Sequence, residues 1–89
     1  MISNDIHLFC SYTEVMEFRQ LEYLVAVAEC GGFSRAAKAS FVSQSAVSHQ
    51  IAALERELGV ELFDRAARSV TLTDAGELLV PRARELLRL

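Results

Sequence analysis

The segment 43–59 constrains the fold of this chain more than any other. Ser43 is a good N-cap, because its side-chain oxygen can accept a hydrogen bond from a first-turn amide, and Gly59 can take the left-handed conformation that ends a helix. At about 100° per residue, the apolar side chains between them share one narrow stripe. These side chains are Val47, Ile51, Leu54 and Leu58. The segment therefore predicts a single helix with one buried face.

The opposite face of this predicted helix carries short polar groups instead of the Glu/Lys pairs usual on a solvated helix. It includes Ser45, Ser48 and His49 and has no acidic residue before Glu55. Small side chains let a helix approach a surface closely, and hydroxyl, amide and imidazole groups can hydrogen-bond base edges in the major groove of DNA. By itself the pattern fits an ordinary surface helix equally well, so the neighbouring segments must decide.

Length and composition restrict the chain to one small domain of 89 residues. No apolar run approaches the roughly 18 residues needed to span a membrane, and the first residues do not resemble a secretory signal. Cys10 and Cys30 fit neither a metal-ligand spacing nor a disulfide framework. We therefore expect a cytoplasmic protein of the reducing compartment, with no metal site and no cofactor.

The formal net charge of −3 at first argues against a nucleic-acid partner. The distribution of charge matters more than its sum. No acidic residue lies between Cys30 and Leu54, whereas Arg35, Lys38 and His49 do. A neutral-to-basic face on an acidic body is compatible with DNA, although a monomer that neutralises few phosphates should bind weakly.

Two further helices are predicted before the 43–59 segment. Residues 1–15 have no clear period and are expected to be a poorly ordered extension, with the domain proper covering 16–72. From residue 18 the apolar spacing is helical, and Gly31-Gly32 ends the helix. Phe33 is expected in the core, with Ser34 capping a short helix from Arg35 to about Ser40. The apolar residues of the first helix are Phe18, Leu21, Val25 and Ala28.

The short helix and the 43–59 helix, joined by Phe41-Val42, predict a helix-turn-helix. Ala36 and Ala37 leave little side-chain volume, so that another helix can pack closely over them. The alternative is any compact three-helix domain. The alanine pair, the tight turn and the Ser-Gln opening of the second helix favour the helix-turn-helix.

A two-stranded wing is predicted after Gly59, because 60–65 and 69–72 each alternate apolar and polar residues. Its core-facing residues would be Leu62, Val70 and Leu72. An isolated hairpin is marginally stable, so the wing must pack on the helices. Arg65 lies at its base and Arg68 at its tip, and an arginine on a protruding wing suits the strongly negative minor groove.

The last segment, 73–89, predicts a long linker helix capped by Thr73, with Asp74 favourably placed in its first turn. Pro81 should bend this helix or remove a hydrogen bond, and Gly76 permits a close backbone approach. A domain this small cannot cover the whole apolar stripe, so a partner helix is expected to cover it in a dimer. The stripe consists of Leu78, Leu79, Ala83, Leu86 and Leu87.

The fold expected is therefore mainly α: a winged helix-turn-helix of three helices and a two-stranded wing, followed by a linker helix. Five runs carry a specific resemblance to the N-terminal winged helix-turn-helix DNA-binding domain of LysR-type transcriptional regulators. The resemblance extends from Met16 to Leu89. The five runs are Phe18–Leu21, Phe33–Ala37, Ser43–Ile51, Leu54–Arg65 and Leu72–Gly76.

The resemblance implies how such a domain would engage DNA. In that family the second helix of the motif enters the major groove, the wing touches the minor groove, and the linker helix pairs two subunits antiparallel. Full-length members add a C-terminal ligand-sensing domain and assemble as tetramers. That domain lies outside the present sequence, which ends within the expected linker helix, so no small-molecule ligand is expected here.

The family positions can be carried onto individual residues of this chain. The recognition-helix contacts correspond to Gln44, Ser45, Ser48 and His49, and the minor-groove wing residue to Arg68. The residues expected near DNA phosphates are Arg19, Arg35, Ser43 and Thr73.

Three positions depart from the family pattern. The family usually has proline at Ser45 and often arginine at His49, so base preference should differ. Ser40 replaces a usual buried leucine, and Phe41 is expected to fill part of that volume.

Sequence-specific binding of double-stranded DNA by a dimer, for transcriptional regulation, is the function that this sequence favours. Two recognition helices would read a palindromic operator. The alternative is a protein-interaction module that heterodimerises with full-length relatives through the linker helix. An enzyme is not expected, because Ser48 and His49 project roughly 100° apart on a helix and no acid orients the imidazole.

Overall fold

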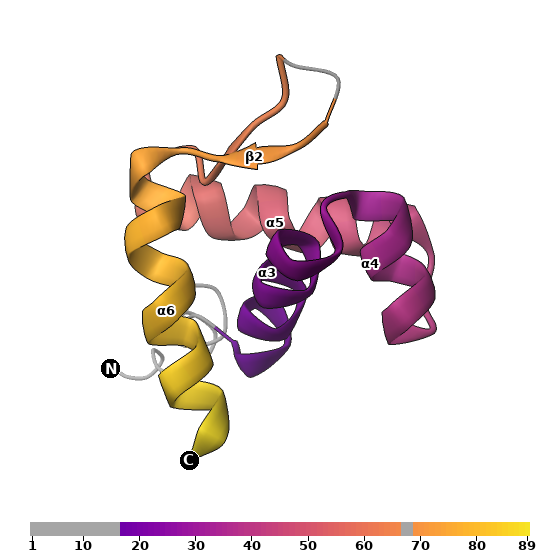
Figure 1. The fold of residues 1–89 in the computed structure, drawn as a ribbon, viewed down its shortest axis with the longest axis horizontal. Helices are drawn as coiled ribbons and strands as arrows, with labels where there is room; N and C mark the ends of the chain where they lie inside the picture. The colour runs from indigo at the N-terminus through magenta and orange to yellow at the C-terminus, as the bar shows by residue number, and fades with distance from the viewer. Residues whose placement is uncertain (1–16, 67–68) are drawn as a thin grey trace, which may run out of the picture.

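The computed structural model describes residues 17–66 and 69–89. Helix α3 occupies the centre, with α4 and α6 on either side of it, α5 crossing all three and the wing extending from one end (Figure 1). The expected extension 1–15 and Arg68 lie outside the described residues. In chain order the elements are α3 (Phe18–Cys30), α4 (Phe33–Ser40), α5 (Gln44–Leu58), β1 (Phe63–Asp64), β2 (Thr71–Leu72) and α6 (Asp74–Arg88).

Local capping chemistry sets three of the helix ends as predicted. The side chain of Ser43 accepts a hydrogen bond from the amide of Ala46 at 3.1 Å and so begins α5. Gly59 ends α5 in the left-handed region, with φ of 76°. The side chain of Thr73 accepts from the amide of Gly76 at 3.1 Å and begins α6.

The prediction that Ser34 caps the second helix is wrong. Helix α4 begins at Phe33, and Gly32 occupies the N-cap position without a side-chain hydrogen bond. Phe33 is buried, as predicted, and its ring meets that of Phe63 edge-on, with centroids 5.6 Å apart. This long-range contact lets Phe33 enter the core from within the first turn of the helix, so that the helix starts earlier than its local signals indicate.

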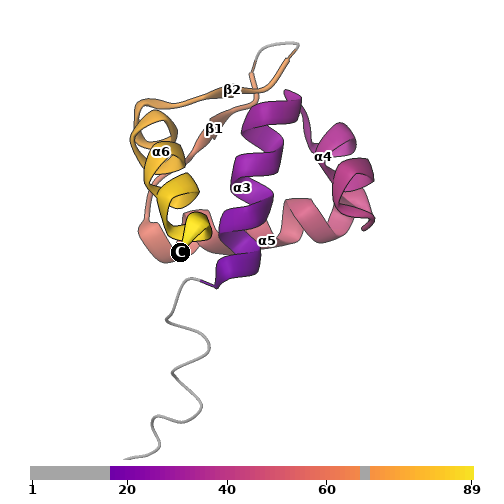
Figure 2. The same ribbon diagram turned by 60° about the horizontal axis from the view of Figure 1, so that its bottom comes forward.

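The core lies where the four described helices meet beneath the wing (Figure 2). Val47, Ile51 and Leu54 are fully buried, which confirms most of the stripe predicted for α5. Leu58, at the last turn, is partly exposed. In α3 the buried apolar face is wider than the predicted line, because α4, α5 and α6 all pack against this helix. It consists of Leu21, Tyr23, Leu24 and Val27.

Two phenylalanines expected in the interior lie on the surface instead. Phe18, in the first turn of α3, is 63% exposed. Phe41 is 94% exposed and adopts a left-handed conformation with φ of 60° at the end of α4. Its backbone amide donates to the carbonyls of Ala37 and Lys38, so the turn conformation directs the side chain outward. Phe41 therefore does not fill the volume next to Ser40.

The wing is a short antiparallel pair in which Phe63 faces Leu72 and Asp64 faces Thr71. Both strands are shorter than the sequence pattern indicates. Leu62 and Phe63 are both buried, so the predicted alternation fails at this point. The reason is that Leu62 precedes the strand and lies against the start of α6, where its carbonyl accepts a hydrogen bond from the Thr73 amide at 3.0 Å.

Helix α6 runs through Pro81 without interruption and packs along α3. Gly76 is buried, and a Cβ atom there would overlap the carbonyl oxygen of Leu62, which confirms the predicted close backbone approach. Ala83 must be removed from the expected dimer surface, because it is completely buried in the core of the chain itself. Among the described residues, no helix has the length and apolar character needed to cross a membrane.

Candidate nucleic-acid interface

The outer face of α5 is accessible at its N-terminal half. Gln44, Ser45 and His49 are exposed, and Ser48 is half-buried. Neither α6 nor any other described segment buries these side chains. The helix is oriented by its opposite face, where Val47 and Ile51 are fixed in the core. A row of short polar groups is thus presented on a rigid element, which is the arrangement that a groove-reading helix requires.

A shallow open groove of about 510 Å³ separates the start of α3 from the start of α5. It brings Arg19 into one surface with three residues that the sequence also selected: Ser43, Ser45 and His49. An exposed guanidinium beside the N-terminal turn of a helix gives this groove a positive character suited to a phosphate. The remaining lining residues are Tyr23, Val42, Ala46 and Gln50.

A pair of glutamine side chains ties α3 to α5 beside this groove. The Nε2 atom of Gln20 donates to Oε1 of Gln50 at 3.3 Å, and the Oε1 atom of Gln20 accepts from the Glu17 amide at 3.2 Å. Gln20 is buried, so these bonds satisfy polar atoms that would otherwise be costly to bury. Gln50 was not among the residues predicted from the sequence, although a glutamine on the core side of an amphipathic helix is a usable signal for such a contact.

Two residues expected near phosphates make contacts within the chain and do not line the groove. The Nη1 atom of Arg35 donates to the carbonyl of Cys30 at 3.2 Å, at the C-terminal end of α3. The hydroxyl of Thr73 donates to the carbonyl of Glu61 at 2.6 Å while it caps α6. Both side chains therefore stabilise junctions between elements.

Arg65 at the base of the wing is also engaged within the chain. Its Nη2 atom lies 3.3 Å from Oε1 of Glu55, and its guanidinium carbon lies 5.0 Å from the centroid of the Phe33 ring. The carboxylate and the ring face restrain the guanidinium on the side of the wing that faces α5. The structure thus places Arg65 apart from the groove that contains Arg19.

Arg56 is a residue of the α5 surface that sequence analysis did not select. Spacings of four, seven and eleven residues place Ser45, His49, Ala52 and Arg56 along one face of α5. Arg56 is exposed in the last turns of the helix. The face therefore carries small polar groups at its N-terminal end and one cation at its C-terminal end. Arg56 could have been predicted from the sequence, because its spacing from Ser45 and His49 places it on the same face of the helix.

Comparison with known proteins identifies the class to which this fold and surface belong. Residues 18–77 match the profile of the bacterial regulatory helix-turn-helix proteins of the lysR family. The chain belongs to this family. It is 54% identical over 74 residues to the HTH-type transcriptional regulator TfdT of Cupriavidus pinatubonensis, covering 83% of this chain and 32% of TfdT. It is 55% identical over 73 residues to the DNA-binding transcriptional dual regulator OxyR of Escherichia coli, covering 82% of this chain and 24% of OxyR.

Solved structures of LysR DNA-binding domains share the fold. A complex of the BenM DNA-binding domain with catB site 1 DNA superposes with a TM-score of 0.80 at 41% identity, covering 82% of this chain and 81% of that one. A complex of the CbnR DNA-binding domain with DNA gives a TM-score of 0.78 at 48% identity, covering 82% and 84%. The relatives are helix-turn-helix transcriptional regulators rather than enzymes. The predicted family and the winged helix-turn-helix fold are thereby confirmed.

Proposed function

We propose that this domain binds double-stranded DNA in a sequence-dependent manner, with α5 in the major groove, and so regulates transcription. The observation that carries the proposal is the exposed row of short polar side chains on the N-terminal half of α5, beside Arg19 in one open groove. The BenM and CbnR domains, which share this fold, were solved as complexes with DNA. A protein with this function would act at the nucleoid, in the cytoplasm.

Different side chains of this surface are proposed to have different roles. Gln44, Ser45, Ser48 and His49 would contact base edges, because their short polar groups are exposed or half-exposed on the face of α5. Arg19 and Arg56 would contact phosphates, which position the protein without specifying sequence. Ser43 and Thr73 would contribute mainly through the helix ends that they cap.

A dimer built through α6 is proposed to read a palindromic site. Leu78 and Leu86 are 65% and 41% exposed on α6, while Leu79 and Leu87 are half-buried against the core. A second α6 would cover these leucines and place two recognition helices about one turn of DNA apart. A longer chain with a ligand-sensing domain would assemble further, into tetramers. The same leucines would also serve a heterodimer with a full-length relative.

The recognition surface can be tested once a bound duplex has been selected from a random library. His49→Ala and Gln44→Ala should each weaken binding to the selected duplex by about 1–3 kcal/mol, with a much smaller loss on a scrambled duplex. Arg19→Ala should weaken both duplexes alike and reduce the salt slope of binding by about one. Fluorescence anisotropy at several salt concentrations measures both effects. Equal losses on both duplexes for His49→Ala and Gln44→Ala would show that these residues do not read bases.

The dimer can be tested by sedimentation of the chain with and without the selected duplex. Leu86→Asp and Leu78→Asp should yield monomers that bind the palindromic duplex more weakly. Val60→Asp is the matched control, because Val60 is an exposed apolar residue outside α6. A wild-type monomer that binds DNA with full affinity contradicts the dimer. A stable dimer without salt-sensitive DNA affinity would favour the protein-interaction role instead.

A further inference from the structure

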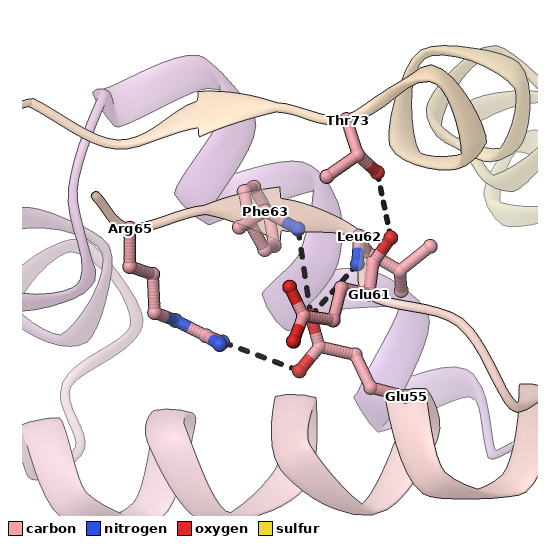
Figure 3. A network of polar contacts seen from close by, with 6 residues as sticks. All are labelled: Glu55, Glu61, Leu62, Phe63, Arg65 and Thr73. Atoms are coloured by element: carbon pink, nitrogen blue, oxygen red, sulfur yellow. Dashed lines mark hydrogen bonds and ion pairs between the residues drawn. The ribbon is translucent and has the colours of Figure 1, made fainter. Parts of the chain in front are cut away.

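The segment 61–63, which leads from α5 into β1, has its backbone groups held from two sides (Figure 3). From α5, Oε2 of Glu55 accepts hydrogen bonds from the amides of Leu62 at 2.8 Å and Phe63 at 3.4 Å. From the start of α6, Thr73 donates its amide to the Leu62 carbonyl at 3.0 Å and its hydroxyl to the Glu61 carbonyl at 2.6 Å. The base of the wing is therefore fixed to both helices.

Among the described residues, Glu55 is the only residue of α5 whose side chain forms hydrogen bonds with this segment. Its side chain is only 10% exposed. A carboxylate that is nearly buried is costly unless donors surround it. Here all the donors come from the wing base, with Oε1 accepting from Arg65 at 3.3 Å and Oε2 accepting from the two amides. These are charge-assisted bonds, which are stronger than neutral ones.

Arg65 extends the same network to α4. Its guanidinium lies over the ring of Phe33, and that ring meets Phe63 edge-on. Arg65 thus contacts the first turn of α4 and the recognition helix from the end of β1. These two contacts hold the guanidinium against α4 and α5, while 45% of the Arg65 side chain stays exposed.

We propose that Glu55 is a positioning residue for DNA binding, which sets the wing relative to the recognition helix, and that Arg65 acts through Glu55 rather than on DNA. The inference rests on the proposed function. A helix in one groove and a wing at the next can both engage a duplex only at one relative placement, and the Glu55 carboxylate is the α5 group that joins the two elements. Glu55 itself faces the wing base and reads no base.

The test compares Glu55→Ala and Glu55→Gln with Glu57→Ala and Glu57→Gln in the full chain. Glu57 is the matched control, because it is exposed on the same helix and makes no side-chain hydrogen bond or ion pair with the described residues. Each substitution removes one negative charge. Binding to the selected duplex is measured by anisotropy at a temperature where circular dichroism shows every variant folded, and hydroxyl-radical footprinting maps the protected sugars.

Glu55→Ala should lose on the order of tenfold in affinity, the size of about one charge-assisted contact. Protection next to the recognition helix should remain, while protection on the wing side should weaken. Glu55→Gln should recover part of the loss, because its amide oxygen still accepts from Leu62 and Phe63. The Glu57 variants should bind as tightly as the wild type, or more tightly, with the same footprint.

Arg65→Met tests the second half of the inference through the salt dependence of binding. A phosphate contact contributes about 0.9 to the slope of log affinity against log salt, so Arg19→Ala should lower the slope by about one. Arg65→Met should leave the slope unchanged, even where it lowers thermal stability. A slope that falls as it does for Arg19→Ala would overturn the role assigned to Arg65.

The outcomes separate this inference from the function on which it rests. If the wild type binds no duplex in a salt-sensitive manner, the proposed function fails and the positioning role fails with it. If the wild type binds but folded Glu55→Ala matches Glu57→Ala in affinity and footprint, only the positioning role is overturned. Amide hydrogen exchange at Leu62 and Phe63 shows independently whether Glu55→Ala has released the wing base.

Discussion

The two halves of α5 use their polar side chains in opposite ways. In the N-terminal half, Ser45 bonds to Ser43 and Gln50 accepts from Gln20, but the side chains of Gln44, Ser48 and His49 make no hydrogen bond with any part of the chain that the structure describes. In the C-terminal half, Glu55 accepts three, all from the wing base. Both halves rest on the same buried stripe, so the difference does not arise from core packing.

The comparison shows how one helix can serve both as a binding surface and as part of the scaffold. Water satisfies an exposed polar group at little cost, so Gln44, Ser48 and His49 remain available to a partner. A carboxylate that is nearly buried must have donors from the chain itself, so Glu55 fixes the segment that supplies them. The two ends also differ in their backbones. The turn before α5 has Phe41 in the left-handed region, whereas Gly59 occupies it after α5.

The largest expected effect on stability comes from overpacking the wing base, to which the C-terminal half of α5 is hydrogen-bonded. In Gly76→Ala, the added Cβ would overlap the Leu62 carbonyl oxygen and lie 2.8 Å from Cδ2 of Leu72. Because backbone cannot rotate away as a side chain can, we expect a loss of about 3 kcal/mol in the free energy of unfolding, at the upper end of overpacking effects. Urea denaturation measures it. A loss below about 1 kcal/mol would mean that the wing base can shift away from α6.

The free energies of unfolding of Glu55→Ala and Gln44→Ala compare the two halves of α5 directly. Glu55→Ala leaves the amides of Leu62 and Phe63 without their acceptor, and we expect a loss of about 2 kcal/mol in the free energy of unfolding. Gln44→Ala, at the free end of the same helix, should change it by less than about 0.5 kcal/mol. Equal effects in urea denaturation would contradict the distinction between the two halves.

Ser43→Ala tests a residue that both caps α5 and lines the groove beside Arg19. It removes the oxygen that accepts from the Ala46 amide, and loss of such a cap costs about 1 kcal/mol of stability. The preference among duplexes should stay the same, because the side chains proposed to contact bases are unchanged. Thermal denaturation and competition anisotropy check the two parts. A changed base preference would assign Ser43 a direct role in recognition.

The smallest expected effect is a gain in stability. Phe41 is exposed and holds φ of 60°, a conformation that asparagine tolerates better than a bulky residue does. Phe41→Asn should therefore raise the free energy of unfolding by about 0.5 kcal/mol, since no buried contact is lost. Urea denaturation resolves this against the wild type. A decrease would indicate that the Phe41 ring makes a contact that stabilises the turn.

Much of the fold could be predicted because its determinants lie within a few residues of each other. The cap of α5, its apolar stripe and the close approach at Gly76 follow from residue type and spacing, and the structure confirms them. Exposure of the polar face of α5 was also predicted. The start of α4 and the width of the buried face of α3 were not, because both depend on contacts with segments from elsewhere in the chain.

The expected contact residues divide in the same way. Arg19, Ser43, Ser45 and His49 come together in one groove. Arg65, chosen because an arginine on a wing suits a groove of DNA, instead meets a carboxylate ten residues away. Residue type alone cannot distinguish these uses, because a guanidinium is equally suited to a phosphate and to a carboxylate.

The sequence by itself determined where α5 and α6 begin, where α5 ends and which face of α5 is apolar, since capping and periodicity act over one or two turns of a helix. Only the tertiary structure decided that Ala83 lies inside the core and that Glu55 holds the wing base. Those outcomes depend on which distant groups come within hydrogen-bonding or van der Waals distance once the helices have packed.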